Sequence, residues 1–502
     1  MAAGAVAKGA GRLPQLVASG QWLTTKDGEV VILRGVNLVS KTSKTPEELG
    51  FDERSAQLLQ DRGFSVVRLG VLWCNVEPYL MPNGTNEYQT DYLASLKRTI
   101  ELLSRHGIYT LVDFHQDAFS VPWGYGAPLW ALACVTGTAG AANGGVIYQR
   151  VGFPNVYFGT TPTESANPTE TDCDFAIDAF WNRQTVGGTG GPTLWEQYGD
   201  MVQFVAWFFH DRAGDILGYD PFNEPPPGSL WIQSYSAGPP PNPFANGCKT
   251  FDETLLQPFY QSVITRLREA HPEAIVWFEP NGLFGMGAPN SLVKPDFPNV
   301  GFNFHNYDSP TYQTPLTNSQ GFQEAYDVPL LCSEYGATTN PDVVTTVAAL
   351  NDQYMLSSIY WTYFNNARFV FAATGGQLPP DPRSQGIVRN MAGSLKDPLN
   401  VNFDILEALT RVYPRIIAGT PDSFSYDPGT QVFNLTYSTQ MVAGGAPRSV
   451  TSIVVPACLY PSGYTPSVTN GTWVKTPEGL EVTASASPGG TTTDVSVTIS
   501  PA

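Results

Sequence analysis

Short apolar runs alternate with amphipathic stretches along most of the chain. The runs have the length of buried strands, and the stretches between them repeat apolar residues with the period of a helix. We predict eight strands, at residues 30–37, 65–69, 108–113, 216–219, 274–278, 300–304, 328–335 and 355–360. We predict helices over residues 51–62, 88–106, 194–211, 251–270 and 401–412. This alternation is typical of an α/β fold, and eight such units predict a (β/α)8 barrel, or TIM barrel.

The two ends of the chain differ from this alternation. Residues 19–28 predict a short hairpin with Asp27-Gly28 as its turn, which would close the bottom of the barrel. From about residue 420 the helical period disappears, and β-branched runs between Gly, Pro and Ser turns predict an all-β sandwich. The predicted units are therefore an N-terminal extension (1–18), a catalytic barrel (19–419) and a C-terminal β-sandwich (420–502).

Composition excludes several classes of function. The formal net charge of -18, with no basic stripe, argues against binding to a phosphate backbone. Six cysteines occur without a C-x-x-C pair, which argues against a structural zinc site, and Cys134, Cys173 and Cys248 lie in loop-like insertions that suit disulfides. Residues 1–10 lack the apolar core of a signal peptide. We expect a secreted enzyme whose signal peptide is missing from this sequence.

Two glutamates follow apolar strands in the same way. The run at 216–219 leads to Asn223-Glu224, and the prolines that begin at Pro225 prevent a helix directly after it. The run at 328–333 delivers Glu334, and Gly336 then breaks the strand. A single Asn-Glu-Pro sequence occurs by chance and can simply cap a loop. Two carboxylates at two strand ends, however, are what retaining glycoside hydrolysis needs, one as acid/base and one as nucleophile.

Further polar and aromatic residues fall at or just after the carboxyl ends of predicted strands. The full set is Arg68, His115, Asn223, Glu224, His305, Tyr307, Glu334 and Trp361. In a (β/α)8 barrel the catalytic groups stand at this end of the strands. One histidine or tryptophan alone would be assigned to the core; the clustering at strand ends favours a single active site.

With these residues the chain resembles glycoside hydrolase family 5, within the retaining (β/α)8 glycosidases. The resemblance implies that Glu224 is the general acid/base and that Glu334 is the nucleophile. It also implies four supporting roles. Asn223 would contact the substrate 2-hydroxyl, and Arg68 and Tyr307 would orient Glu334. His115 and His305 would form the walls of the sugar subsite, and Trp361 would be its stacking floor.

A narrower resemblance covers nearly the whole chain. The motifs at 114–117 (Phe-His-Gln-Asp), 176–182, 219–229 and 413–421 are similar to those of the endoglycoceramidases, which cleave the bond between glycan and ceramide in glycosphingolipids. This implies that Asp117 and Trp181 bind the glucose next to the scissile bond. A lysine after the first strand would assist them, either Lys41 or Lys44, and we favour Lys41.

The substrate of such an enzyme is an amphiphile, so an apolar wall is expected beside the sugar pocket. Long excursions at about 118–191 and 225–249 interrupt the barrel, and loops of this length are usually functional. As a hypothesis, we assign their aromatic residues to this wall, although they can equally serve the packing of the loops themselves; they are Trp123, Tyr125, Trp130, Phe153, Tyr157, Phe158, Trp231 and Tyr235.

The sequence therefore predicts a retaining endo-β-glycosidase that releases the glycan from ceramide. Its carboxyl groups should lie about 5–5.5 Å apart. The alternatives are a polysaccharide endo-β-1,4-glucanase of the same family, a β-glucosyl- or galactosylceramidase, and a catalytically silent carbohydrate- or lipid-binding protein. We expect no metal or organic cofactor, no nucleic-acid partner, a monomer, and transient contact with a membrane or micelle surface.

Overall fold

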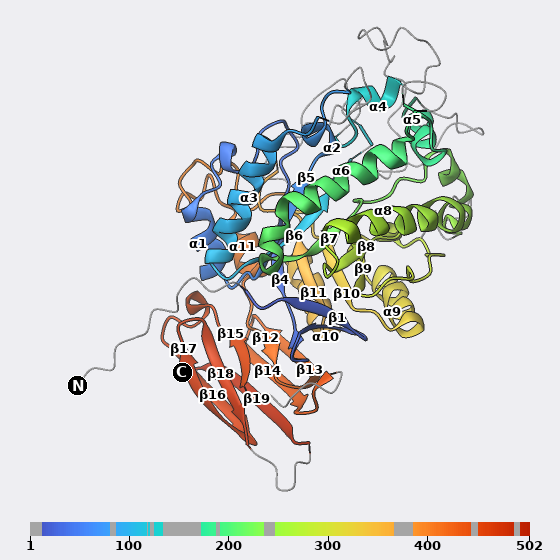
Figure 1. Cartoon of the computed structure of the whole chain (residues 1–502). Helices are drawn as coiled ribbons and strands as arrows, with labels where there is room; N and C mark the ends of the chain where they lie inside the picture. Colours follow the sequence, from blue (N-terminus) through green and yellow to red (C-terminus); the bar gives the residue numbers. More distant parts are fainter. Residues whose placement is uncertain are drawn as a thin grey trace.

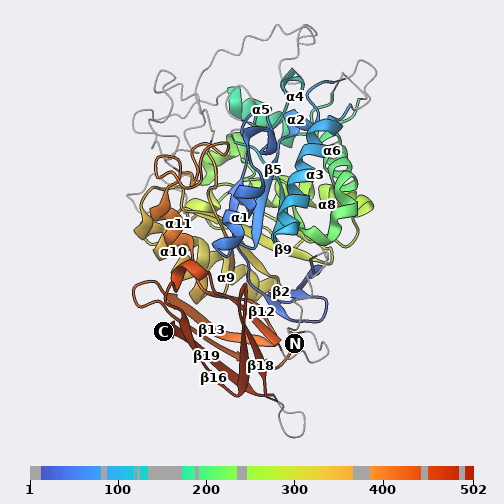
Figure 2. The same cartoon turned by 90° about the vertical axis from the view of Figure 1, so that its left-hand side faces the viewer.

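A computed structural model describes residues 13–80, 87–117, 119–120, 125–133, 172–186, 191–234, 246–365, 385–442, 450–485 and 492–502. The structure has a barrel with surrounding helices and a β-sandwich below it (Figures 1 and 2). Among the described residues, no helix combines the length and the apolar character needed to cross a membrane.

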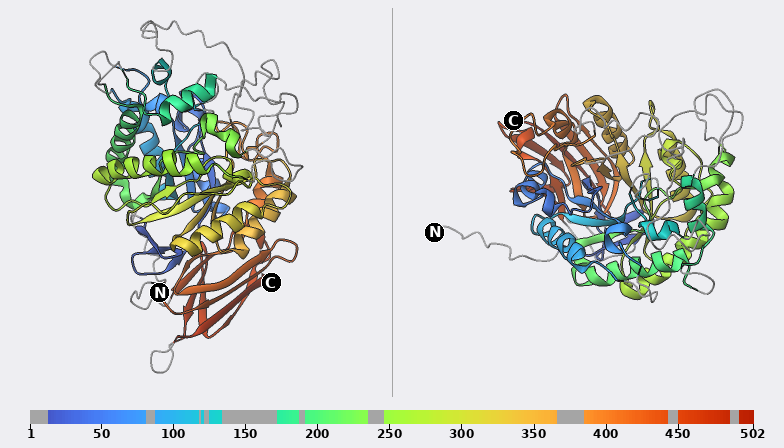
Figure 3. Two further views of the ribbon diagram at one scale, coloured as in Figure 1. Left: turned by 90° about the vertical axis from the view of Figure 1, so that its right-hand side faces the viewer. Right: turned by 90° about the horizontal axis from the view of Figure 1, so that it is seen from above.

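The barrel is a closed parallel sheet with the strand order β10-β11-β4-β5-β6-β7-β8-β9. This confirms the predicted (β/α)8 fold. Its strands are β4 (Arg34–Leu38), β5 (Val66–Val71), β6 (Tyr109–Phe114), β7 (Ile216–Asp220), β8 (Val276–Phe278), β9 (Val300–Asn306), β10 (Leu330–Tyr335) and β11 (Ser357–Tyr360). Seen from above, helices surround these strands (Figure 3, right).

The helices of the described residues mostly follow the predicted ones. They are α1 (Glu53–Asp61), α2 (Trp73–Val76), α3 (Thr90–Arg105), α4 (Leu129–Ala133), α5 (Asp172–Trp181), α6 (Leu194–Phe209), α7 (Lys249–Phe251), α8 (Gln257–Ala270), α9 (Thr314–Tyr326), α10 (Pro341–Gln353) and α11 (Phe403–Leu409). The five predicted helices correspond to α1, α3, α6, α8 and α11. Helices α2, α4, α5, α9 and α10 were not predicted. Two of the four buried residues of α9 are Pro315 and Ser319, so its apolar face is short and gives a weak helical pattern.

The N-terminal segment departs from the predicted pattern. The predicted first strand, 30–37, is two strands: β3 (Val30–Val31) pairs with β12 (Tyr413–Ile417), and only β4 enters the barrel. The hairpin is formed by β1 (Leu16–Ser19) and β2 (Trp22–Thr25), with its turn between Ser19 and Trp22. The predicted turn at Asp27-Gly28 instead connects β2 to β3.

The β-sandwich consists of two antiparallel sheets. One has the order β1-β2-β3-β12-β15-β18-β17 and so includes the N-terminal strands; the other has the order β13-β14-β19-β16. Alternate residues of β14, namely Phe433, Leu435 and Tyr437, are buried between the sheets. The remaining strands are β13 (Thr420–Asp427), β14 (Val432–Ser438), β15 (Val450–Val454), β16 (Tyr464–Thr469), β17 (Gly471–Thr476), β18 (Gly479–Ala484) and β19 (Asp494–Pro501).

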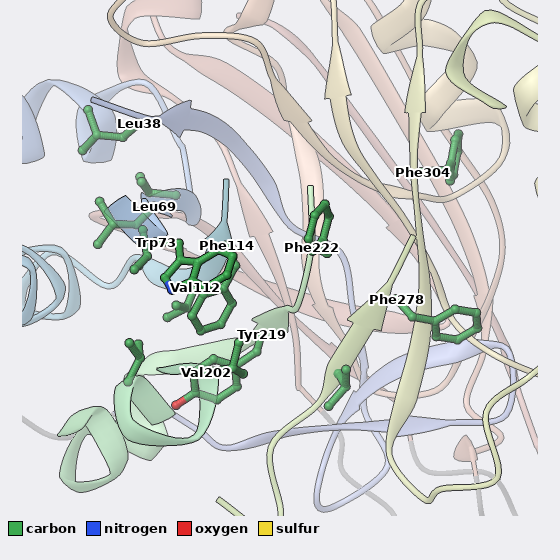
Figure 4. Packing of buried hydrophobic residues seen from close by; sticks show 14 of the residues in the cluster. Leu38, Leu69, Trp73, Val112, Phe114, Val202, Tyr219, Phe222, Phe278 and Phe304 are labelled. Carbon is green, nitrogen blue, oxygen red and sulfur yellow. The ribbon is translucent and has the colours of Figure 1, made fainter. Parts of the chain in front are cut away.

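The inside of the barrel has an apolar lower layer and a polar upper layer. Leu111, Leu217, Trp277 and other apolar residues fill the lower layer, and Leu23 of the N-terminal hairpin packs against them. Above them lie buried polar groups from successive strands and from the residues just after them: Asn37, Arg68, Asp113, Asp220, Glu279, Asn303 and Glu334. The side chains between strands and helices are apolar (Figure 4). These buried charged groups of the barrel interior therefore lie at the end where the strands terminate.

The cysteine predictions are tested only in part. Cys134 and the side chain of Cys173 lie outside the described residues. Cys332 is buried in β10, and Cys74 is partly buried at α2. The Cys248 thiol is buried and donates a hydrogen bond to the carbonyl of Leu230.

Candidate active site

Glu334 is held by two donors in the upper layer of the barrel. It lies in β10 beside a bulge in the pairing with β9, a device that re-aims a side chain. Arg68 donates to its Oε1 at 2.6 Å, and the Tyr307 hydroxyl donates to its Oε2 at 2.8 Å. Burial raises the pKa of Glu334, and the positive charges of His305 and Arg68 oppose this shift. Both carboxylate oxygens are thus fixed by hydrogen bonds that favour the ionised form.

Glu224 lies in the loop after β7, which ends at Asp220, and has a left-handed backbone conformation with φ 42°. Side chains hold this uncommon conformation at both ends of the residue. Its N–H donates to Glu279 Oε2 at 2.8 Å, and its carbonyl accepts from Gln116 Nε2 at 2.9 Å. The carboxylate bonds to His305 Nδ1 at 2.8 Å and remains 20% exposed, so a substrate can reach it.

The two glutamates lie close together. One oxygen of Glu224, one oxygen of Glu334 and a ring nitrogen of His305 lie within 4.8 Å of one another. Inverting glycosidases separate their carboxyl groups by about 6.5–9.5 Å to admit a water, whereas retaining enzymes need about 5–5.5 Å. The spacing also suits a metal ion, but the positively charged guanidinium of Arg68 bonds to Glu334 Oε1 and the Tyr307 hydroxyl bonds to its Oε2, so the surroundings of Glu334 favour a carboxylate pair over a cation site.

Arg68 organises the polar layer from its centre. The guanidinium is fully buried and contacts Asp113 at 3.0 Å, Asp220 at 2.7 Å and Glu279 at 3.2 Å, in addition to Glu334. It also donates to Asn223 Oδ1 at 2.7 Å. Sequence reasoning found Arg68 but missed four of the groups around it: Asp113, Asp220, Glu279 and Asn303.

A signal for three of these missed residues exists in the sequence. Asp113, Asp220 and Glu279 each end or directly follow an apolar strand run, as Glu334 does. They were overlooked because strand ends also carry acidic residues that only cap loops. Asn223, by contrast, was predicted, and both of its amide atoms have protein partners, because its Nδ2 also donates to the carbonyl of Gln116.

A charged wall lies next to the carboxylates. The rings of His115 and Trp361 stack at 5.3 Å with an interplanar angle of 11°. Lys41 Nζ lies 4.4 Å from the Trp361 ring centre and 2.5 Å from Asp117 Oδ2. Lys44 is exposed, so the geometry favours Lys41 as the lysine of this site. A flat indole beside fixed charges suits a sugar, which has an apolar face and polar edges.

His115 makes this wall sensitive to pH. Burial alone would lower the pKa of His115, but the carboxylates of Asp113 and Asp117 outweigh it and raise the pKa to about 9. Because the folded-state pKa exceeds that of the unfolded chain, the stabilisation is complete below about pH 6.5 and is lost as the pH rises through about 9. The thermal midpoint of the wild type should therefore decrease as the pH is raised from about 6.5 to about 9.

The matching variant is His115→Gln, whose thermal midpoint should change less over the same pH range, as measured by differential scanning calorimetry. Substitution of the exposed His210 by Gln serves as the control and should follow the wild type. A His115→Gln profile parallel to that of the wild type would contradict the assigned ion pairs.

Trp181 is not brought into this group. Its side chain is 1% exposed, its indole donates to the carbonyl of Pro226 at 2.7 Å, and Phe251 and Phe259 pack edge-on against it. The prediction that it binds glucose is not supported by this position. The residue anchors the apolar packing under the Asn223–Pro226 segment instead.

The proposed aromatic wall is described only in part. Trp123, Phe153, Tyr157, Phe158 and Tyr235 lie outside the described residues. Trp231 is buried, and Trp130 packs edge-on against Trp73 and donates to the carbonyl of Glu77. In the described part of the loops these two tryptophans contact protein groups, and the hypothesis that they also line an apolar wall stays a prediction.

Comparisons with known proteins agree with this geometry. Residues 24–369 match the family described as cellulase (glycosyl hydrolase family 5), and residues 411–499 match the glycoside hydrolase family 5 C-terminal domain. Endoglycoceramidase I of Rhodococcus hoagii is 25% identical over 505 residues, covering 95% of this chain and 87% of that protein.

Solved structures share the fold over nearly the whole chain. Endo-glycoceramidase II from Rhodococcus sp. matches with a TM-score of 0.69 at 22% identity, covering 96% of this chain and 99% of that chain. The same Rhodococcus protein in a ganglioside GM3 complex matches with a TM-score of 0.68 at 21% identity, covering 96% and 100%.

Proposed function

This chain belongs to glycoside hydrolase family 5, and we propose that it is a retaining endo-β-glycosidase that releases the intact glycan from ceramide in glycosphingolipids. One observation carries the mechanism. Two carboxylates from β10 and the end of β7 approach within 4.8 Å at the end of the barrel where the strands terminate. That spacing is below the separation of inverting enzymes and is in keeping with retaining enzymes, in which one carboxylate attacks the sugar itself.

The first step assigns different roles to the two glutamates. Glu334 attacks the anomeric carbon, because Arg68 and Tyr307 orient its oxygens and compensate its charge. Tyr307 remains a donor, because burial and the nearby carboxylates hold its pKa well above its ordinary value. Glu224 protonates the oxygen of the departing ceramide, which then leaves as a neutral alcohol.

The second step reverses the role of Glu224. Once ceramide has left, Glu224 is ionised and accepts a proton from the water that attacks the anomeric carbon of the glycosyl-enzyme. The Glu334–sugar bond breaks, and the glycan leaves with its original anomeric configuration. The same ring nitrogen of His305, Nδ1, bonds to Glu224 at 2.8 Å and lies 3.5 Å from Glu334, so it can follow this change of charge.

The ceramide part of the proposal rests on relatives. The similar proteins named endoglycoceramidases extend over both the barrel and the β-sandwich, although identity is low. We also propose that the enzyme is secreted and that it contacts a micelle or membrane surface transiently, since its substrate is an amphiphile.

The substrate assignment is tested with two substrates in parallel. We expect lactosylceramide in detergent micelles to yield free ceramide and cellotetraose to remain intact, with the Glu334→Gln variant inactive on both. Cleavage of cellotetraose without ceramide release would assign the chain to the polysaccharide hydrolases of the family instead.

The acid/base assignment predicts a dependence on the leaving group. For Glu224→Gln, kcat/KM on phenyl β-lactoside should fall by about 10²- to 10⁴-fold, the usual contribution of general acid catalysis. On dinitrophenyl β-lactoside, whose leaving group needs no proton, kcat/KM should stay close to wild type. Steady-state kinetics on both glycosides check this, and an equal loss on both would contradict the role of Glu224 as acid.

A further inference from the structure

Glu279, directly after β8, is a buried carboxylate that contacts the backbone of Glu224 directly and the side chain of Glu224 through His305. Its Oε2 accepts the backbone N–H of Glu224 at 2.8 Å. Its Oε1 lies 3.1 Å from His305 Nε2, and the other ring nitrogen of His305 bonds to the Glu224 carboxylate at 2.8 Å. Glu279 is 2% exposed and lies behind His305, so it reaches Glu224 and not the substrate.

We propose that Glu279 is a positioning residue for glycoside hydrolysis, which holds the backbone of Glu224 through one oxygen and fixes the proton of His305 through the other. This inference rests on the proposed role of Glu224 as acid/base. It adds a residue that neither the family match nor the sequence motifs assign.

The backbone contact has a clear purpose. Glu224 has a positive φ of 42°, which a glutamate adopts only when its surroundings impose it. Gln116 fixes the carbonyl of Glu224 and Glu279 fixes its N–H, so the residue is clamped from two neighbouring loops. Loss of either contact should let the carboxylate move away from the scissile bond.

The imidazole contact determines where a proton lies. Because Glu279 accepts at His305 Nε2, that nitrogen keeps its proton. His305 Nδ1 is therefore the ring atom that shares a proton with Glu224. Burial alone would lower the pKa of His305, but Glu279 and Glu334 outweigh it and hold the pKa well above its ordinary value. The pair formed by His305 and Glu224 therefore retains one proton, which is available to the departing alcohol.

The charge of Glu279 is defined by the groups around it. Arg68 of β5 lies 3.2 Å away, Asn303 of β9 donates to Oε1 at 2.9 Å, and Tyr260 of α8 donates to the Glu279 carbonyl. Burial and the negative charge of Glu279 hold the pKa of neighbouring Asp220 well above its ordinary value. Burial alone would raise the pKa of Glu279, but the positive charges of His305 and Arg68 outweigh it and lower the pKa to about 2, so Glu279 carries a negative charge.

The test combines leaving-group dependence with a pH profile for Glu279→Gln, which keeps the shape of the side chain and removes its charge. We expect kcat/KM on phenyl β-lactoside to fall by about 10- to 100-fold, part of the contribution of general acid catalysis, and kcat/KM on dinitrophenyl β-lactoside to change little. Without the negative charge the His305–Glu224 pair loses its proton more easily, so the alkaline limb of kcat/KM should move to lower pH by about one unit.

Two further variants separate charge from position. Glu279→Asp keeps the charge but is too short for both contacts, so the rate on phenyl β-lactoside should fall while the alkaline limb stays in place; this variant carries the test if Glu279→Gln does not fold. Gln116→Met removes the other clamp on the Glu224 backbone without removing a charge, so it should also lower the rate and leave the limb unmoved.

The inference is overturned if Glu279→Gln keeps the wild-type pH profile, or if it slows both glycosides equally. Glu224→Gln and Glu334→Gln, measured alongside, test the proposed function separately. If Glu224→Gln shows no leaving-group dependence, the assigned chemistry fails; if it does and Glu279→Gln does not, only the role of Glu279 fails.

Discussion

Replacement of Glu334 by alanine should reduce kcat on lactosylceramide by on the order of 10⁴- to 10⁶-fold, the range seen when a nucleophile is removed from a catalytic unit. Among the described residues, Asp220 and Glu279 cannot take its place, because both are buried and contact Arg68. Without Glu334 the barrel retains Arg68 and Tyr307 but has no atom to attack the anomeric carbon. Steady-state kinetics of ceramide release measure the loss.

Azide identifies the role of the missing carboxylate. In Glu334→Ala, azide should enter the vacated space and give an α-glycosyl azide from dinitrophenyl β-lactoside, because attack then occurs from the nucleophile's face. The matched variant Glu224→Ala should give the β-glycosyl azide, because the sugar is first transferred to Glu334. Substitution of the exposed Glu324 by Ala should leave activity unchanged. If Glu334→Ala gave the β-glycosyl azide and Glu224→Ala gave the α-glycosyl azide, the roles of the two glutamates would be exchanged.

Replacement of Asp352 by alanine should lower the free energy of unfolding by about 3–5 kcal/mol, because it leaves buried arginines without their partner. Asp352, at the end of α10, is 1% exposed and lies 2.6 Å from Arg34 of β4. Its second oxygen accepts from Arg411 Nε at 3.0 Å, and Arg411 also donates to the carbonyl of Tyr426 in β13. The aspartate thus joins the bottom of the barrel to the β-sandwich.

Denaturant unfolding followed by tryptophan fluorescence measures this effect. The control is Glu273→Ala, which removes an exposed pair with Lys26 and should change the free energy of unfolding far less. A loss for Asp352→Ala as small as that of the control would show that the buried cluster contributes little to stability. If unfolding shows two transitions and the variant lowers stability only in the second, the buried Asp352 cluster stabilises one domain and not the junction between the barrel and the β-sandwich.

The barrel could be predicted because the apolar runs that form its strands lead into the polar residues of the site, so the same segments indicate both the fold and the site. Each parallel strand is buried on both faces, so it appears as a short apolar run, and a polar residue at its end must have a reason to be there. This argument found Glu224, Glu334 and Arg68 from the chain alone. It missed Glu279 because a single acidic residue before a turn looks the same whether it caps a loop or enters a core.

The pairing partner of a strand and the burial of a side chain depend on residues far away in the sequence, so they could not be predicted. The apolar run at 30–37 is continuous, and nothing in it shows that β3 pairs with the β-sandwich while β4 enters the barrel. The resemblance to the endoglycoceramidases implied a sugar contact for Trp181, but its neighbours Phe251 and Phe259 come from a distant helical segment and enclose it. Burial by residues far away in the sequence has no local signal.

The position of bond cleavage tests the central claim most directly. We would incubate a mixed glycosphingolipid pool with the enzyme in ¹⁸O-labelled water and analyse the products by mass spectrometry, with Glu334→Gln as the control. Hydrolysis at the anomeric carbon of the bond between glycan and ceramide predicts intact oligosaccharides that carry ¹⁸O at the reducing end, unlabelled free ceramide, and neither product in the control. Release of single sugars from the outer end of the glycan, or label in the ceramide, would contradict it.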